Sequence, residues 1–375
     1  MIREASAPRE NWTGLLDEVG FTFHTAEGPY WRETACYALT AAEVAELERA
    51  TTELQALCLA VVEHVIVENR FDALRIPDHY RAAIRRSWER QAPSLYGRFD
   101  LRYDGEGPPV LLEYNADTPT SLLEASVAQW HWVEATHPHD DQFNRIHEAL
   151  IARWRHIGRE HRAERFHFTG LLGSDEDRQT VLYLEDTAKQ AGLCADRVSL
   201  EAIGWDVQAR RFCDEQCRPI SWVFKLYPWE WMLSDAFTPL LLESSVGIVE
   251  PAWKMILSNK GVLPLLWELF PSHPNLLPAY VDPSRLGREY VRKPFWSREG
   301  ANIVFVGPCG TIATSGPYGD CESIYQACHP LPDYGGWHPV IGSWVIGDEA
   351  AGIGIRESSG FITDDESCFV PHYFR

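Results

Sequence analysis

The spacing of apolar residues predicts a long amphipathic helix close to the N-terminus. Thr40 and Glu43 have the spacing of a capping box, in which each side chain binds the backbone N–H of the other residue. Apolar residues then recur at helical intervals from Val44 to Val65. This pattern predicts a helix over residues 41–68.

A β-hairpin is predicted next, between residues 94 and 124. Apolar and polar residues alternate up to a turn-rich stretch from Asp104 to Pro109, and the segment from Val110 to Asn115 has the pattern of a second strand. Helices are predicted to follow over residues 121–135 and 143–162.

Two further patterns divide the rest of the chain. Strands and one helix alternate between residues 165 and 250, with strands predicted at 165–169, 198–201 and 221–227 and a helix at 178–191. From residue 290 onward glycine turns separate short strands, typical of an antiparallel lobe, at 290–293, 301–306, 324–326, 340–346 and 352–356. The sequence therefore predicts an α+β fold with sub-lobes at roughly 1–164, 165–250 and 251–375.

Composition and charge then exclude several classes of protein. The 375 residues include 34 Lys and Arg against 54 Asp and Glu, a net charge of −20. This balance argues against nucleic-acid binding and against docking on anionic membranes. No apolar run approaches the roughly 18 residues of a membrane span, and no secretory signal is visible, so a cytoplasmic location is expected. The motifs GxxxxGK[ST], GxGxxG after a strand and GxSxG are absent.

The nine cysteines are scattered along the chain. Only Cys213 and Cys217 lie close together, and no pair of His or Cys residues stands nearby. We expect free thiols in a reducing compartment, with a metal or redox role for this pair as the alternative.

The predicted hairpin carries the first cluster of candidate functional residues. Strand side chains alternate between faces, so Arg98 and Asp100 point together, and so do Glu113 and Asn115. Their oxygens suit Mg²⁺ bound together with substrate phosphates, and Arg98 could neutralise a transferring phosphoryl group. The alternative is a polar outer face of the sheet with surface ion pairs.

A second cluster lies in the C-terminal half. Lys260 lies in the segment EPAWKMILSNKGVLPLLW, and Lys293 and Arg298 follow near the turn SREG. A lysine together with free backbone N–H groups can hold phosphate. Gln326 lies near a possible hinge between lobes, and Arg356 ends the apolar run GIGI at a predicted cleft. The alternatives are exposed lysines with an ordinary hairpin turn, and an inter-lobe salt bridge for the arginine.

The segment FKLYPWEW, residues 224–231, has the composition of a core segment at a strand end. It contains two charged residues, Lys225 and Glu230, which are unusual there. We expect packing in the core, with a cleft-lining role for the two charges as the alternative.

Several long motifs resemble one known family. They are GRFDLRYDG, LLEYNADTPTSLLEA, FKLYPWEWML, EPAWKMILSNKGVLPLLWE, VRKPFWSREGAN and IGSWVIGDEAAGIGIRE. In this order they resemble the C-terminal, ATP-dependent synthetase domain of the glutathionylspermidine synthase family, over nearly the whole chain. The chain also resembles stand-alone members that carry the provisional description acid–amine ligase. It lacks the amidase domain of the bifunctional members, so no hydrolytic half-reaction is expected.

The resemblance implies an ATP-grasp fold with the permuted segment order of eukaryotic-type glutathione synthetases, plus a pre-ATP-grasp α/β lobe. It implies that Mg²⁺, as two ions, binds the residues that match the family's metal ligands, and that Arg98 stabilises the phosphoryl transition state. Arg356 matches the arginine that meets the acyl phosphate. The implied metal ligands are Asp100, Glu113 and Asn115, and the implied ATP contacts are Arg98, Phe99, Asp100, Lys260, Lys293, Gly300, Gln326, Phe361, Ile362 and Thr363.

The implied activity is an ATP- and Mg²⁺-dependent acid–amine ligase. A carboxylate, such as that of a glutathione-like peptide, would form an acyl phosphate, and an amine such as a polyamine would then form the amide. The partners are small-molecule substrates, with no nucleic acid, membrane or obligate protein partner expected. Two alternatives are a small-molecule phosphotransferase and a catalytically inactive nucleotide-binding protein of the same fold.

Overall fold

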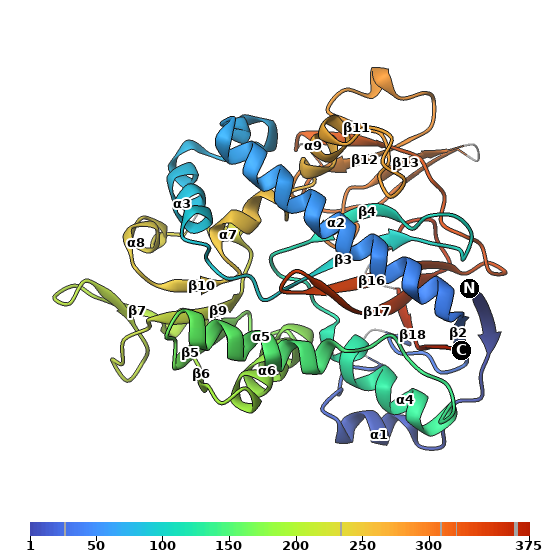
Figure 1. The fold of residues 1–375 in the computed structure, drawn as a ribbon, viewed down its shortest axis with the longest axis horizontal. Coiled ribbons are helices and arrows are strands. Elements are labelled where there is room, and N and C mark those ends of the chain that lie inside the picture. The colour runs from blue at the N-terminus through green and yellow to red at the C-terminus, as the bar shows by residue number, and fades with distance from the viewer. Residues whose placement is uncertain (26–27, 233–234, 308–309, 320, 364–366) are drawn as a thin grey trace.

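The long predicted helix is present as α2 (Ala41–Val67) in the computed structural model, which describes residues 1–25, 28–232, 235–307, 310–319, 321–363 and 367–375. The capping box is confirmed: the Glu43 N–H donates to Thr40 Oγ1 at 3.2 Å, and the Thr40 N–H donates to Glu43 Oε2 at 2.7 Å. In Figure 1, α2 runs diagonally across strands β3 and β16.

Contrary to expectation, α2 is long and apolar enough to cross a membrane, because its most apolar window has a mean hydropathy of 1.4. Half of that window is buried inside the fold, and α2 packs on β16 and β17. Buried apolar residues spread along the helix contribute to one large core cluster. We therefore interpret α2 as a core helix.

The predicted hairpin forms one side of a five-stranded antiparallel sheet, called the central sheet below. Its strands, in spatial order, are β18 (Cys368–Val370), β17 (Glu349–Ser358), β16 (His338–Ile346), β3 (Tyr96–Arg102) and β4 (Val110–Asn115). β16 pairs with β3, so two segments far apart in the sequence share this sheet. The predicted sub-lobe 251–375 contributes strands to three different sheets, because β19 (His372–Phe374) pairs with β2 (Ala35–Leu39) in a separate three-stranded sheet.

A second antiparallel sheet, called the lysine sheet below, contains the strand that ends near Lys293. Its strands, in spatial order, are β11 (Ala279–Tyr280), β15 (Ser323–Ala327), β12 (Tyr290–Pro294), β13 (Val304–Gly307) and β14 (Gly310–Ala313). Helix α9 (Val262–Leu269) packs on this sheet. The predicted antiparallel character of this segment is confirmed.

The predicted α/β segment forms a four-stranded parallel sheet. Its strands are β10 (Gly247–Val249), β9 (Trp222–Leu226), β5 (Arg165–Gly170) and β6 (Cys194–Arg197), with α6 (Asp175–Gln190) packed on β5 and β6 and α5 (Ile146–Glu160) packed on α6. The predicted strand at 198–201 is wrong, because pairing with β5 selects Cys194–Arg197 as the strand. Val198 is buried just after it, and a 3₁₀ turn follows at Leu200–Ala202.

The helix predicted at 121–135 contains a π-helical stretch, Glu124–Ala128, before α4 (Gln129–Thr136). The other α-helices and β-strands of the described residues are α1 (Trp12–Glu18), α3 (Asp78–Glu89), α7 (Trp229–Met232), α8 (Thr238–Glu243), β1 (Ile2–Ala5), β2 (Ala35–Leu39), β19 (His372–Phe374), β7 (Gly204–Asp206) and β8 (Arg211–Cys213). Further 3₁₀ helices span Arg70–Leu74, Ala252–Ile256 and Pro283–Arg285. The eight cysteines that the structure describes are free thiols, Cys213 and Cys217 included. The fold is thus mixed α and β, built around several sheets.

Candidate active site

A cleft of about 460 Å³ lies between the central sheet and the lysine sheet. The central sheet contributes Arg98, Asp100, Glu113, Asn115 and Arg356, and the lysine sheet contributes Val291, Lys293, Phe305 and Gln326. The N-terminal end of α6 and the loop after β4 close another side. All predicted site residues line this cleft except Phe99 and Lys260.

Phe99 is a core residue rather than a cleft residue. It is fully buried and stacks on Tyr114, with ring centroids 3.9 Å apart. Its neighbours on β3, Arg98 and Asp100, line the cleft, so the alternation of side chains along the strand turns Phe99 to the opposite face. The Phe99 side chain therefore does not take part in the cleft.

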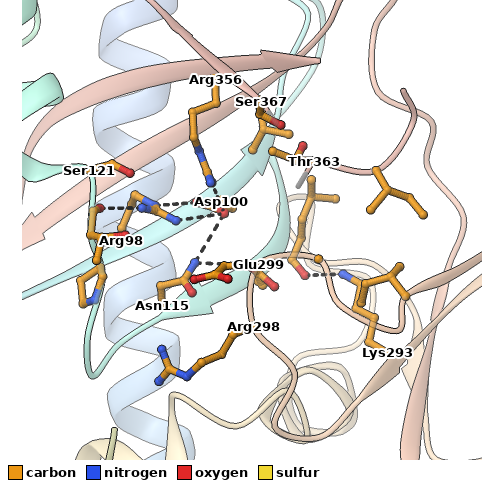
Figure 2. A pocket seen from close by; sticks show the side chains of 18 of the residues that line it. Arg98, Asp100, Asn115, Ser121, Lys293, Arg298, Glu299, Arg356, Thr363 and Ser367 are labelled. Atoms are coloured by element: carbon orange, nitrogen blue, oxygen red, sulfur yellow. Dashed lines mark hydrogen bonds and ion pairs between the residues drawn. The ribbon is translucent and has the colours of Figure 1, made fainter. Parts of the chain in front are cut away.

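Asp100 is the centre of a charged cluster on the hairpin. In the register of β3 and β4, Asp100 lies opposite Glu113, and Arg98 lies opposite Asn115. Arg98 Nε donates to Asp100 Oδ1 at 2.8 Å, and Arg356 Nη2 lies 2.6 Å from Asp100 Oδ2 (Figure 2). The predicted convergence of these side chains is present, and Arg356 from β17 joins them.

The donor set at this cluster suits Mg²⁺ that arrives with substrate phosphates. The Asn115 amide donates to Asp100 at 3.4 Å and to Glu113 at 3.2 Å, so the two carboxylates meet around one side-chain amide. Within the described ranges, no three His, Cys, Asp or Glu side chains gather as a metal site. One or two carboxylates, completed by phosphate and water oxygens, are what Mg²⁺ commonly uses.

Lys293 reaches the floor of the cleft from β12. The residue is 7% exposed, and its ammonium donates to the Leu112 carbonyl and to Gln326 Oε1, both at 2.8 Å. Burial lowers the pKa of Lys293 to about 8, although the charge of Glu113 acts in the opposite direction. The Gln326 amide donates in turn to the Leu111 carbonyl, so it ties β15 to β4.

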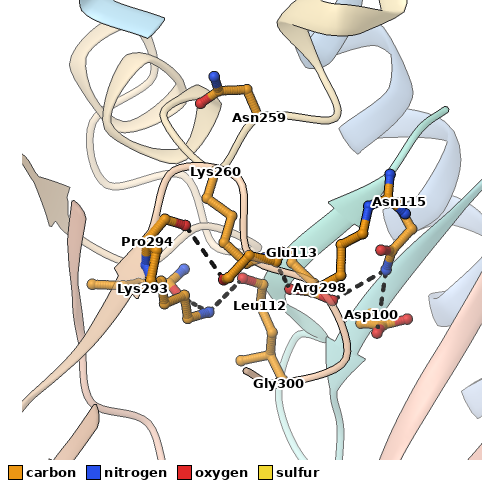
Figure 3. A network of polar contacts seen from close by, with 12 residues as sticks. Asp100, Leu112, Glu113, Asn115, Asn259, Lys260, Lys293, Pro294, Arg298 and Gly300 are labelled. Carbon is orange, nitrogen blue, oxygen red and sulfur yellow. Dashed lines mark hydrogen bonds and ion pairs between the residues drawn. The ribbon is translucent and has the colours of Figure 1, made fainter. Parts of the chain in front are cut away.

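Lys260 stands beside the cleft and contacts it through Glu113. Its ammonium lies 3.0 Å from Glu113 Oε2 and donates to the Ser297 carbonyl at 2.6 Å (Figure 3). Partial burial would raise the pKa of Glu113, but Lys260 and Lys293 outweigh this effect and lower it. Glu113 is therefore an ionised carboxylate held between two cations.

The SREG turn brings the lysine sheet against the C-terminal segment. Gly300 has a φ of +68°, and an added Cβ would come within 2.5 Å of the Thr363 carbonyl oxygen, so glycine is required on both counts. Phe361 and Ile362 line the cleft next to this contact. The ring of Phe361 stacks on that of Phe305, with centroids 5.8 Å apart.

Arg298 in the same turn links three parts of the fold. Its Nε lies 2.9 Å from Glu230 Oε1 on α7, and its Nη1 donates to Thr118 Oγ1 at 2.9 Å. Burial would lower the pKa of Arg298, but the carboxylate of Glu230 outweighs it, so the side chain stays charged. Neither charged residue of segment 224–231 lines the cleft, so the cleft-lining alternative for the two charges is wrong, and Glu230 instead holds the cleft residue Arg298 in place.

Lys225, the other charged residue of that segment, forms a buried ion pair. Its ammonium lies 2.7 Å from Asp117 Oδ1, and the Trp229 N–H donates to Asp117 Oδ2 at 2.9 Å. The pair joins the loop after β4 to the end of β9, which positions the adjacent Thr118. No local pattern in the sequence predicts this pairing, because the two residues lie far apart in the chain.

Removing one partner of this pair should destabilise the protein. Asp117→Asn leaves the Lys225 ammonium buried without a counter-charge, so we expect a loss of about 3–5 kcal/mol in the free energy of unfolding. Denaturant unfolding of Asp117→Asn, and of Asp117→Asn combined with Lys225→Met, provides the measurement. The double variant should recover most of the loss, and two variants of equal stability would contradict this assignment.

One end of the cleft carries negative charge that sequence analysis missed. Glu176 and Asp177 from the first turn of α6 line it, together with Tyr30 and Ser121. Burial, followed by the charge of Glu176, raises the pKa of Asp177 to about 6. In the sequence these acids look like ordinary first-turn residues after the N-cap Ser174, so no local signal marks them as part of a site.

Comparison with known proteins gives consistent results. The family model for the glutathionylspermidine synthase preATP-grasp matches residues 3–375. A Haemophilus influenzae protein with the provisional name acid–amine ligase is 39% identical, over 98% of this chain and 97% of its own length. The trypanothione synthetase of Crithidia fasciculata is 30% identical over 81% of this chain, and the bifunctional glutathionylspermidine synthetase/amidase of Escherichia coli is 28% identical over 89%.

The matched regions differ in how much of each relative they cover. This chain spans 51% of the length of the trypanothione synthetase and 58% of that of the bifunctional enzyme. The match to the Haemophilus influenzae protein is nearly end to end in both chains. Because the family match extends through almost the whole sequence, the chain belongs to the glutathionylspermidine synthase family and is a carbon–nitrogen ligase.

Proposed function

We propose that this protein joins a carboxylic acid to an amine in two steps, with ATP and Mg²⁺ and through an acyl phosphate. The observation that carries the proposal is the cleft itself. It combines Asp100 and Glu113, which are carboxylates of the kind that bind Mg²⁺, with three nearby cations, Arg98, Arg356 and Lys293. It also has an acidic end that suits an ammonium group. The names of the relatives point to the same class of reaction.

The nucleotide would bind between the lysine sheet and the central sheet, as in an ATP-grasp enzyme. Lys293 would contact the phosphates, and Gln326 would lie near the adenine. Asp100, Glu113 and Asn115 would hold Mg²⁺, which offsets charge on the phosphates when bound. Lys260 would turn from Glu113 toward the phosphates, because the metal ion competes with it for that carboxylate.

In the first step, an oxygen of the substrate carboxylate attacks the γ-phosphorus of ATP. The bond from the γ-phosphorus to the bridging oxygen breaks, and ADP leaves with the electron pair. Arg98 and Arg356 flank Asp100, so both would face the charge that builds up on the transferring group. The loop that carries Arg298 and Gly300 would exclude water from the acyl phosphate.

In the second step, the amine nitrogen attacks the acyl carbon. The bond from that carbon to the phosphate oxygen breaks, phosphate leaves, and the nitrogen loses a proton. Glu176 and Asp177 would attract and orient the ammonium form of the amine at the acidic end of the cleft. A polyamine suits this end, because its further ammonium groups would meet the same carboxylates.

A screen of acids crossed with amines tests the proposal. Glutathione with spermidine is the first pair, and the readouts are ADP release and mass spectrometry of the product. We expect an amide and ADP release that depends on both substrates. Release of ADP with a phosphorylated product and no need for amine would instead identify a phosphotransferase, and no turnover with any pair would overturn the ligase proposal.

The protonation state of Lys293 predicts a pH dependence of ATP binding. Its ammonium is charged below its pKa of about 8 and neutral above it, so ATP affinity should fall as the pH rises. Between pH 7 and pH 9 the loss should reach about tenfold. In Lys293→Arg, which stays charged over this range, titration calorimetry should give a flatter profile. Identical profiles for both proteins would contradict the assignment.

A further inference from the structure

A tyrosine and a buried glutamate form a short hydrogen bond at the acidic end of the cleft. Tyr30 lines the cleft, and its hydroxyl donates to Glu124 Oε1 at 2.6 Å. The Tyr30 ring contacts Phe21, Phe23 and Phe369, which fix its position. The hydroxyl is therefore held between the cleft and the carboxylate behind it.

Glu124 is a carboxylate without an ion pair among the described residues. Glu124 is 1% exposed, and its carboxylate accepts a hydrogen bond from the neutral Tyr30 hydroxyl. The charged groups that face it are Glu176 from α6, which disfavours ionisation, and Arg98 from β3, which favours it. Burial, followed by Glu176, raises the pKa of Glu124 to about 8, so this carboxylate is unusually basic.

The local backbone places Glu124 at this point. It begins the π-helical stretch Glu124–Ala128, and such stretches often occur at functional sites. Ser121, three residues earlier, has a φ of +71° and lines the cleft. The turn into this helix thus brings both Ser121 and the Tyr30–Glu124 pair to the acidic end.

We propose that Tyr30 and Glu124 together accept a proton from the ammonium form of the amine, so that its nitrogen can attack in the second step of the reaction. The inference rests on the proposed ligase activity and adds catalytic residues to it. Before the nitrogen attacks, one N–H proton of its ammonium form passes to the Tyr30 oxygen while the Tyr30 hydroxyl proton passes to Glu124. The neutral nitrogen then bonds to the acyl carbon, the bond from that carbon to the phosphate oxygen breaks, and the departing phosphate takes the second N–H proton. Tyr30 ends unchanged, Glu124 ends as a carboxylic acid, and the nitrogen ends neutral in the amide.

The other two carboxylates at this end suit a different task. Glu176 and Asp177 line the cleft directly, so they can pair with the ammonium groups of a polyamine that do not react and keep them charged. A base must instead take a proton away, and its efficiency rises with its basicity up to the working pH. Glu124 is buried behind Tyr30, and its carboxylate is more basic than that of Asp177.

The experiment separates the two steps with hydroxylamine. Hydroxylamine is already neutral near pH 7, so it traps an acyl phosphate as a hydroxamate without help from a base. In Glu124→Gln and in Tyr30→Phe, amide formation from glutathione and spermidine should fall by about 10²-fold or more. Hydroxamate formation with glutathione and ATP should stay within about twofold of the wild type.

The pH profile and a control sharpen the test. In the wild type, amide formation should rise with pH as Glu124 loses its proton, and this rise should disappear in Glu124→Gln. Glu134→Gln removes an exposed carboxylate from α4 and should change neither product. Melting temperatures show whether each variant folds, and Tyr30→Phe decides the question if Glu124→Gln does not fold.

Two results would overturn the inference in different ways. If hydroxamate and amide formation fall together, in step with melting temperature, the pair has only a structural role. If the wild type forms amide and hydroxamate and both variants keep full amide formation, the proton leaves by another route. A wild type that forms neither product with any acid and amine would instead overturn the ligase proposal on which the inference rests.

Discussion

Replacing Arg98 with lysine is expected to lower kcat by about 10³-fold, while the KM for ATP changes by less than about threefold. Arg98 lies 6% exposed beside Asp100, where the proposed phosphoryl transfer would develop charge. An interaction that strengthens only in the transition state affects kcat rather than KM. A lysine ammonium cannot present the planar fork of donors that a guanidinium offers. Steady-state kinetics with the acid–amine pair found in the screen provides the measurement.

The structure also gives Arg98 a positioning role, which must be distinguished from its proposed role in phosphoryl transfer. Its Nη1 donates to the Thr120 carbonyl at 2.8 Å, which ties β3 to the loop after β4. If this contact alone explains the residue, activity and melting temperature will fall together in Arg98→Ala, and Arg98→Lys will recover activity. Arg102→Lys is the matched control, because Arg102 is on the same strand and pairs with Asp104 outside the cleft. Near-normal kcat in Arg98→Lys would contradict the catalytic assignment.

Replacing Glu113 with glutamine is expected to lower activity at limiting Mg²⁺ by at least about 10²-fold. The change removes one of the two carboxylates proposed to hold the metal ion, and it also removes the counter-charge of Lys260. The Glu113 side chain is 28% exposed at the cleft, so the fold should remain intact. Activity measured over a Mg²⁺ titration, together with a melting curve, gives the result.

Excess metal distinguishes loss of a metal ligand from other effects. If Glu113 binds Mg²⁺, high Mg²⁺ should restore part of the activity of Glu113→Gln. Glu106→Gln is the control, because Glu106 is exposed in the turn of the same hairpin and should leave the titration unchanged. A variant at position 113 that keeps full turnover at limiting Mg²⁺ would exclude the residue as a metal ligand.

Much of the local structure could be predicted because its causes are local. The capping box of α2, the hairpin around Asp104–Pro109 and the alternation along β3 and β4 depend on residues close together in the sequence. The same alternation places Phe99 in the core, although the family resemblance assigned it to the nucleotide site. The strand at Cys194–Arg197 was missed because pairing with β5, rather than its own composition, selects it.

The assembly of the site depended on contacts between distant segments. Arg356 reaches Asp100 because β16 inserts between β17 and the hairpin, and no local pattern specifies that pairing. Lys260 meets Glu113 on β4, and Arg298 meets Glu230 on α7, although the two residues of each pair lie far apart in the sequence. The acidic end of the cleft depends on how the N-terminal end of α6 lies against Tyr30 and the π-helical stretch.

The sequence by itself determined the types of chemistry available: acids and an amide at strand spacing on a hairpin, lysines near a glycine turn, and motifs that identify the family. Tertiary structure decided which of these groups share one cleft, and it changed their basicity. Lys293, Asp177 and Glu124 have shifted pKa values because burial and charges from other segments act on them. Burial and long-range charge are properties of the folded chain, so no reading of the sequence alone could assign them.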